Sequence, residues 1–143
     1  IRYLVSTAGR DANLLLNVGP QPDGNIPAAA LERLAAMGEW LGTYGETIYG
    51  TRSTLVKPQP WGVTTHKDDR MWLHVFPADA FKAASDGQIY VPYKAGRKVA
   101  SVTPFGSPDV KLGFKQYKEG LFVTLPSDMP ANVPDYIVEV TFK

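Results

Sequence analysis

The stretch Asn13-Leu-Leu-Leu-Asn-Val-Gly-Pro-Gln-Pro-Asp-Gly-Asn-Ile-Pro27 decides how the first part of this chain folds. Residues 14–16 are all leucine, without the alternation of a half-exposed strand, so residues 14–18 are typical of a strand covered on both faces. Gly19-Pro20 ends this strand, and Pro22-Asp23-Gly24 predicts a turn. Because such a strand needs parallel neighbours, we expect it to belong to a larger sheet whose other strands lie outside this chain.

An amphipathic helix is predicted after the turn. Pro27 suits the first helical position, where a missing N–H costs nothing, and Gly45 stands where a left-handed residue would end the helix. Apolar residues recur at helical spacing, with charged residues on the other side: Leu31, Leu34, Met37, Trp40 and Leu41 against Glu32, Arg33 and Glu39. Strand, loop and helix form one β/α unit, and residues 1–7 resemble the end of a preceding helix. Because the chain also begins without methionine, we expect it to be the C-terminal piece of a longer protein.

The composition excludes several classes of function. With 143 residues, 44% hydrophobic and 20% charged, the chain is typical of a globular protein. A net charge of +1 gives no electrostatic reason for nucleic acid or an anionic membrane as a partner, and we expect neither. The absence of cysteine excludes thiol chemistry. The only histidines, His66 and His74, are too few for a metal site, so we expect no metal and no cofactor; His74 is predicted to be outward-facing or half-buried.

The second half of the chain has the pattern of a β-protein. Residues 53–70 are rich in proline, threonine and charge, and are predicted to be a linker between an incomplete unit at residues 1–52 and a domain at residues 71–143. Short segments separated by turn signals favour an antiparallel β-sandwich. The predicted strands cover residues 71–76, 87–93, 98–103, 110–117, 121–125 and 136–143. The expected fold class is therefore mainly β, an antiparallel β-sandwich preceded by a single β/α unit.

Several motifs of the first half occur in one colinear order: Asn13-Leu-Leu-Leu-Asn-Val-Gly-Pro20, Asp23-Gly24, Ile26-Pro27, Leu31, Gly38, Trp40-Leu41 and Gly45-Glu-Thr-Ile-Tyr-Gly-Thr-Arg52. In this order they resemble glycoside hydrolase family 29, the α-L-fucosidases. The resemblance implies a (β/α)8-type catalytic barrel followed by a β-sandwich, with residues 14–18 as the last barrel strand and residues 27–44 as the last barrel helix. It also implies hydrolysis of terminal α-L-fucose from glycoconjugates with retention, by an Asp nucleophile and a Glu acid/base.

The catalytic residues that the resemblance implies do not map onto this chain. Retaining glycosidases need two carboxyl groups about 5–5.5 Å apart, and Asp11 and Asp23 flank the predicted strand at opposite ends. We therefore expect a fragment without catalytic residues, inactive by itself. The resemblance implies a secreted, periplasmic or lysosomal parent enzyme, and the compartment of this protein stays open.

Three side chains are candidates for contact with sugar. Asn17 lies near the C-terminal end of the predicted strand, where the active site of a β/α barrel forms; it either binds substrate or, the interpretation that we favour, satisfies loop backbone around Gly19. Trp72 and Tyr90, expected on neighbouring strands, are the natural pair among the aromatic residues that could stack on sugar. Ordinary core packing is the favoured alternative for both.

Three hypotheses follow for the function. The chain is a fragment of an α-L-fucosidase, whose partners are the missing barrel and, through the intact enzyme, a fucosylated glycan. Alternatively, the sandwich is a carbohydrate-binding module, or a purely structural domain that braces the barrel. In each case the orphan strand needs a partner, so we expect the isolated chain either to self-associate or to place residues 14–18 against the sandwich.

Overall fold

The computed structural model describes residues 1–94 and 96–143. Its helices are α1 (Arg2–Ala8), α2 (Ala28–Tyr44), the 3-10 turn η1 (Gly45–Thr47) and α3 (Pro77–Ala83). Its strands are β1 (Gly62–Lys67), β2 (Arg70–Val75), β3 (Gln88–Val91), β4 (Val99–Pro104), β5 (Phe114–Tyr117), β6 (Gly120–Thr124) and β7 (Tyr136–Phe142). None of the helices in these ranges has the length and hydrophobicity that crossing a membrane requires.

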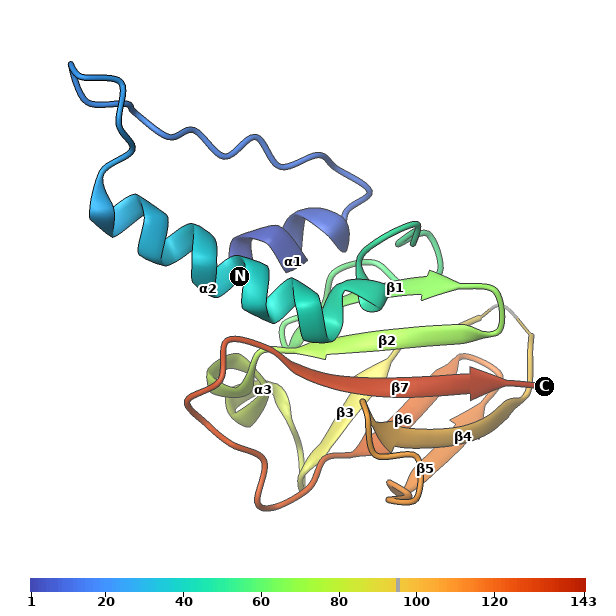
Figure 1. Ribbon diagram of the computed structural model, residues 1–143. Helices are drawn as coiled ribbons and strands as arrows, with labels where there is room; N and C mark the ends of the chain where they lie inside the picture. The colour runs from blue at the N-terminus through green and yellow to red at the C-terminus, as the bar shows by residue number, and fades with distance from the viewer. Residues whose placement is uncertain (95) are drawn as a thin grey trace.

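The strands form two antiparallel sheets that pack face to face (Figure 1). One sheet, here called sheet A, has the order β1-β2-β7-β4, and the other, sheet B, has the order β3-β6-β5. The core between them is apolar, and at its centre Leu73, Ile89, Leu121 and Val138 have no exposed surface. The predicted antiparallel β-sandwich is therefore confirmed.

Sheet A is covered on both faces, because α1 and α2 pack on the side away from sheet B (Figure 1). A second hydrophobic cluster forms there, which we call the junction cluster: Val5, Trp40, Val63, Trp72, Phe76 and Ile137. This explains why Ile137 interrupts the alternation of β7. β7 lies inside sheet A, and the cover over Ile137 comes from α1 and α2.

An ionic contact adds to the junction cluster. The guanidinium of Arg70 on β2 lies 3.2 Å from the carboxylate of Glu46 in η1 and 4.9 Å from the ring centre of Trp72. The indole Nε1–H of Trp72 donates a hydrogen bond of 2.9 Å to Glu139 Oε2 on β7. Helical and β segments are therefore joined by apolar packing and by polar contacts at the same place.

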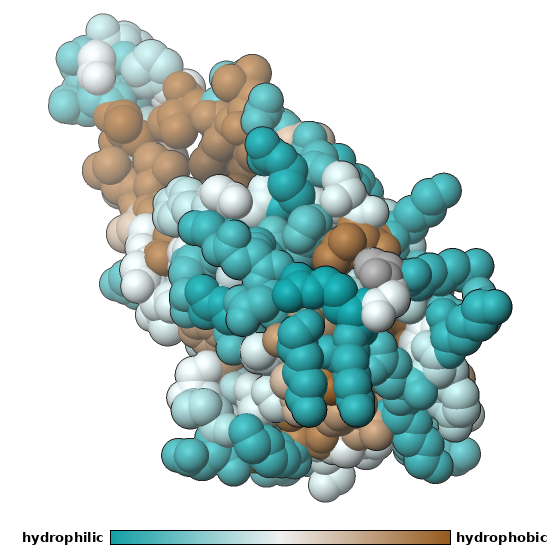
Figure 2. All heavy atoms as spheres, turned by 90° about the vertical axis from the view of Figure 1, so that its right-hand side faces the viewer, coloured by the Kyte–Doolittle hydropathy of each residue, from teal (hydrophilic) through white to brown (hydrophobic). Residues whose placement is uncertain are grey.

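The strand predicted at residues 14–18 is not present. The segment is extended but pairs with no strand in the described part of the chain, and Leu15 and Leu16 are 85% and 50% exposed. The physical reason is that a strand apolar on both faces needs a neighbour on each side, and no segment of residues 1–94 and 96–143 supplies one. The alternative that the segment lies against the sandwich is also wrong. Figure 2 shows the hydrophobic surface gathered in the upper part of the molecule, where this segment and α2 project.

We expect the isolated 143-residue chain to self-associate, because adjacent exposed leucines on an unpaired extended segment favour pairing with another copy. The double variant Leu15→Ser/Leu16→Ser is expected to shift the chain toward monomer in analytical ultracentrifugation. Val110→Ser, at an apolar side chain that is exposed elsewhere on the molecule, is the matched control and should leave the distribution unchanged. A wild-type chain that remains monomeric at all concentrations would contradict the prediction.

Other local predictions were wrong in instructive ways. Gly45 has φ −57°, a right-handed value, so α2 continues into η1, and the left-handed glycine is Gly50 at φ +71°. Residues 47–50 form the end of η1 and a turn. β1 lies inside residues 53–70, which were predicted to be a linker. The polar Thr64 and Thr65 did not indicate a buried strand, but both are buried there, and their hydroxyl groups donate hydrogen bonds to carbonyl oxygens. The division of the chain at residues 52 and 70 stays a prediction.

Candidate functional site

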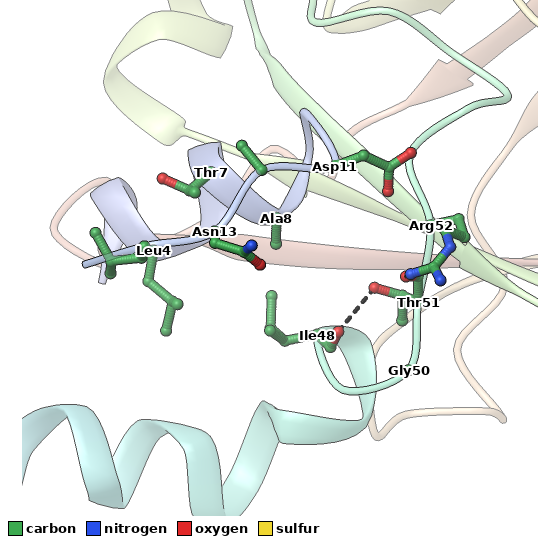
Figure 3. Close-up of a pocket in the computed structure, with 11 residues that line it drawn as sticks. Leu4, Thr7, Ala8, Asp11, Asn13, Ile48, Gly50, Thr51 and Arg52 are labelled. Carbon is green, nitrogen blue, oxygen red and sulfur yellow. Dashed lines mark hydrogen bonds between the residues drawn. The ribbon is translucent and has the colours of Figure 1, made fainter. Parts of the chain in front are cut away.

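A cavity of about 610 Å³ lies between α1, the segment that follows it and the loop after η1 (Figure 3). It has an apolar part and a polar part. The lining combines residues of α1 and the turn after it with residues from the two ends of the fucosidase-like motifs: Leu4, Thr7, Ala8, Asp11, Ala12, Asn13, Leu14, Ile48, Gly50, Thr51 and Arg52. Figure 3 shows Ile48 and Asn13 directed toward the space between α1 and the η1 loop.

The polar groups of this cavity are largely used to hold the loops together. Asp11 accepts a hydrogen bond of 3.1 Å from the backbone N–H of Ser53, and Arg52 donates to the carbonyl of Thr51 at 3.2 Å. The hydroxyl of Thr51 donates to the carbonyl of Ile48 at 2.8 Å. Asp11 is the one carboxylate in the lining. A retaining glycosidase needs a pair of carboxyl groups across the scissile bond, so this cavity lacks the groups for that chemistry.

A second cavity, about 340 Å³, lies between the loops after β4 and β6 and also contains a single carboxyl group, that of Asp128. Burial raises the pKa of the Tyr136 phenol beside it, and the negative charge of Asp128 raises this pKa further. The second cavity therefore offers no carboxyl pair either.

Asn17 is exposed and lies outside both cavities. Its position follows from that of residues 14–18, which have no sheet to hold them in the described residues. Asn13, the other asparagine of the motif, lines the first cavity. A role of Asn17 toward substrate stays a prediction.

Trp72 and Tyr90 are not brought together. Trp72 lies on β2 of sheet A, and Tyr90 lies on β3 of sheet B, so the expectation of neighbouring strands is wrong. Trp72 is fully buried in the junction cluster, whereas Tyr90 is 40% exposed on the outer face of sheet B. Trp72 therefore has no ring surface for a ligand, and Tyr90 does.

A buried polar chain, which sequence reasoning missed, connects four segments of the fold. The hydroxyl of Thr65 on β1 donates to the carbonyl oxygen of Thr47 in η1 at 2.6 Å, and it lies 3.0 Å from His74 Nε2 on β2. His74 Nδ1 lies 2.7 Å from Asp135 Oδ2, just before β7, and both side chains have no exposed surface. The prediction of an outward or half-buried His74 is wrong. No local signal marks this pairing, because His74 and Asp135 are 61 residues apart in sequence.

The hydrogens of this chain can be assigned from its geometry. A carbonyl oxygen only accepts, so the single Thr65 hydroxyl hydrogen goes to Thr47, and His74 Nε2–H must donate to Thr65. A further hydrogen is then shared between His74 Nδ1 and Asp135 Oδ2, while Asp135 Oδ1 has no partner among the described residues.

A hydroxyl, a histidine and an aspartate also make up the Ser-His-Asp triads of hydrolases. Here, however, the hydroxyl is buried and its hydrogen is committed to a carbonyl. The arrangement therefore positions η1 on the sandwich and does not attack a substrate.

His66, the other histidine, lies near the surface. Its ring nitrogen Nε2 is 3.0 Å from the hydroxyl of Thr54. Partial burial lowers the pKa of His66, and the charge of Asp11 acts in the opposite direction. Within the two ranges that the structure covers, His66 and His74 do not form part of a cluster of metal-binding side chains.

Comparison with known proteins gives a consistent result. Residues 1–46 match the family model described as Alpha-L-fucosidase. Tissue alpha-L-fucosidase of Bos taurus is 34% identical over 140 residues, which are 94% of this chain and 28% of the relative. The solved structure of alpha-L-fucosidase isoenzyme 1 from Paenibacillus thiaminolyticus superposes with a TM-score of 0.77 at 26% identity, over 99% of this chain and 33% of that one.

A further solved structure shares the fold. The GH29 alpha-L-fucosidase of Bacteroides thetaiotaomicron has a TM-score of 0.81 at 21% identity, over 99% of this chain and 31% of that one. The chain therefore spans about a third or less of the length of these relatives. The similarity in sequence and fold runs over nearly all of its residues, so the chain is similar to α-L-fucosidases throughout, which is consistent with a C-terminal fragment of such an enzyme.

Proposed function

We propose that the intact protein hydrolyses terminal α-L-fucose from glycoconjugates with retention, and that these 143 residues supply the last β/α unit of its barrel and its C-terminal β-sandwich. The observation that carries the proposal is the similarity to α-L-fucosidases over 94% of the chain. The proposal assigns residues 1–52 to the barrel, residues 53–70 to the connection and residues 71–143 to the sandwich. The catalytic Asp and Glu belong, on this proposal, to the remainder of the enzyme.

The exposed leucines support this assignment. Leu15 and Leu16 would be buried if residues 14–18 became an inner strand of a closed barrel, with one face toward its interior and the other toward its helices. Asn17 would then lie near the C-terminal end of that strand, on the catalytic face. At this position Asn17 would either contact the substrate or support the loop at Gly19.

The direct contribution of this chain is mechanical. The junction cluster joins α1 and α2 to sheet A, and the Thr47–Thr65–His74–Asp135 chain fixes η1 to the strands. In the proposed enzyme α2 is the last barrel helix, so these contacts would brace the barrel against the sandwich. They would hold the catalytic face in shape without touching the substrate.

The experiment compares the intact protein with the isolated 143-residue chain on an aryl α-L-fucoside. The intact protein is expected to release the phenol, and the isolated chain is expected to release none, because neither of its cavities offers a carboxyl pair. Product analysis by NMR at early times should show the α-anomer of fucose first, as retention requires. An aryl β-galactoside serves as the control substrate. An inactive intact protein, or turnover by the isolated chain, would refute the proposal.

A further inference from the structure

The outer face of sheet B carries three exposed aromatic side chains on three adjacent strands, which we call the aromatic band: Tyr90 on β3, Phe122 on β6 and Tyr117 on β5. They are 40%, 37% and 57% exposed. Tyr90 is directly opposite Phe122 in the register, and Tyr117 is opposite Gly120. The ring centres lie 4.9 Å apart for Tyr90 and Phe122 and 5.9 Å apart for Phe122 and Tyr117.

The band is held in place by the sheet. Alternate residues of β3 and β6, such as Ile89 and Val123, are fully buried against sheet A, so their neighbours must point outward. The hydroxyl of Tyr90 donates a 2.8 Å hydrogen bond to the carbonyl of Glu119. Its ring covers Gly120, where an added Cβ would lie 2.5 Å from a ring carbon. The glycine thus makes room for the ring, and little conformational entropy remains to be lost when a ligand binds.

The size of the band indicates which kind of partner it fits. From the usual area of aromatic side chains, the three rings expose on the order of 300 Å². A stable protein interface, including one with a second copy of this chain, buries about 800 Å² on each partner. The band is too small for that, but it matches a slender ligand a few rings long.

The polar groups beside the rings favour a carbohydrate as this ligand. Lys115 is opposite Phe122 in the register, and in the described residues it has no carboxylate partner. Just outside β3 and β6, Lys94 pairs with Glu119 at 2.9 Å, and Gln88 donates to Thr124 at 3.3 Å two residues along the strands from Tyr90 and Phe122. Sugar rings present apolar C–H faces that pack on aromatic rings, and hydroxyl groups that bond with amine, amide and hydroxyl groups. The surroundings of the band supply all three kinds of group and little net charge.

The position of the band leaves it open. Figure 1 shows α1, α2 and the extended segment on the outer side of sheet A, whereas sheet B lies on the opposite side of the sandwich. A barrel attached through the helical segment would therefore approach from the side away from the band. We propose that the aromatic band is a carbohydrate-binding surface that holds a glycan chain of two or three sugar units. The identification of this glycan as part of a fucosylated substrate rests on the proposed function. The binding of a glycan by the aromatic band does not depend on it.

The test uses the intact protein and an array of oligosaccharides, each printed with and without terminal α-L-fucose. Wild type is expected to bind members of the array whether or not they carry fucose. Tyr117→Ala and Phe122→Thr are each expected to weaken binding about tenfold, because each removes a stacking ring. Phe81→Ala removes an exposed aromatic ring of α3 outside the band and is the matched control; it should bind as wild type does. Thermal unfolding of each variant checks that the fold is kept.

The same preparations are assayed with the aryl α-L-fucoside, which is too small to reach the band. Its kcat and KM should be unchanged in Tyr117→Ala, while KM for a fucosylated oligosaccharide should rise. If no oligosaccharide binds, or if Phe81→Ala weakens binding as much as Tyr117→Ala, the inference is overturned even when the aryl fucoside is cleaved. If oligosaccharides bind through the band but the aryl fucoside is not cleaved, the inference stands and the proposed function fails. Self-association that Tyr117→Ala abolishes, in the absence of glycan binding, would assign the band to a second copy and also overturn the inference.

Discussion

Replacing Trp72 with alanine is expected to lower the free energy of unfolding by about 3–5 kcal/mol, the usual cost of emptying a fully buried Trp position. Trp72 has no exposed surface and lies in the cluster that joins sheet A to the helices. The substitution also removes the donor to Glu139 and the ring beneath the Arg70 guanidinium. For a chain of this size, the melting temperature should fall by roughly 10 °C.

The measurement is urea unfolding of the intact protein and of the 143-residue chain, together with hydrogen exchange. Exchange should accelerate most in α1 and α2, which lose their packing surface, and least in sheet B, which lies on the other side of the core. Trp72→Phe keeps most of the ring volume and loses the N–H donor, so its cost should be smaller, about 1–2 kcal/mol. A loss below about 1 kcal/mol for Trp72→Ala would show that the junction cluster does not hold the helices.

The second large effect is expected for His74→Ala, at about 3–5 kcal/mol, because removing one member of a buried ionisable pair leaves the other without its partner. Asp135 is buried, and its Oδ1 already has no partner among the described residues. Without the imidazole its Oδ2 would also be unpaired, and Thr65 would lose a donor. The link from η1 to the sandwich would then be weakened together with the sandwich itself.

His66→Ala is the matched control, since His66 is the other histidine and lies near the surface on the same pair of strands. Its cost should remain below about 1 kcal/mol. The double variant His74→Leu/Asp135→Leu removes both polar groups, so its loss of stability should be smaller than the sum of the losses in His74→Leu and Asp135→Leu.

Chemical denaturation of wild type, these two single variants and the double variant gives the coupling energy of the pair. Strict additivity of the two single changes would mean that the pair is not coupled, contrary to the geometry.

Local patterns predicted the parts of this fold that depend on neighbours in sequence. The helical spacing of apolar residues predicted α2, and the short segment between turn signals at residues 87–93 predicted β3. Such patterns succeed because the periods of helix and strand are fixed by the backbone. Val99 and Val102 could not both be assigned inward from alternation alone, because a register shift between Val99 and Ser101 inserts an extra residue.

The candidate sites were predictable only in part, and the reason is distance along the chain. The motif residues Asn13 and Arg52 were recognised in sequence, and they do line one cavity. The aromatic side chains were also noted, but the partner of Tyr90 is Phe122, which pairs with it across sheet B, and not Trp72. Nothing local in the sequence states which strands become neighbours, so the wrong aromatic pair was chosen.

The sequence by itself determined the fucosidase-like motifs, the amphipathic helix and the sandwich class, because each depends on residue types at short, regular spacing. Tertiary structure alone decided the burial of Trp72 under the helices, the pairing of His74 with Asp135 and the unpaired state of residues 14–18. These features depend on which distant segments are present to pack or pair. An apolar segment becomes a strand only when neighbours can accept its backbone hydrogen bonds.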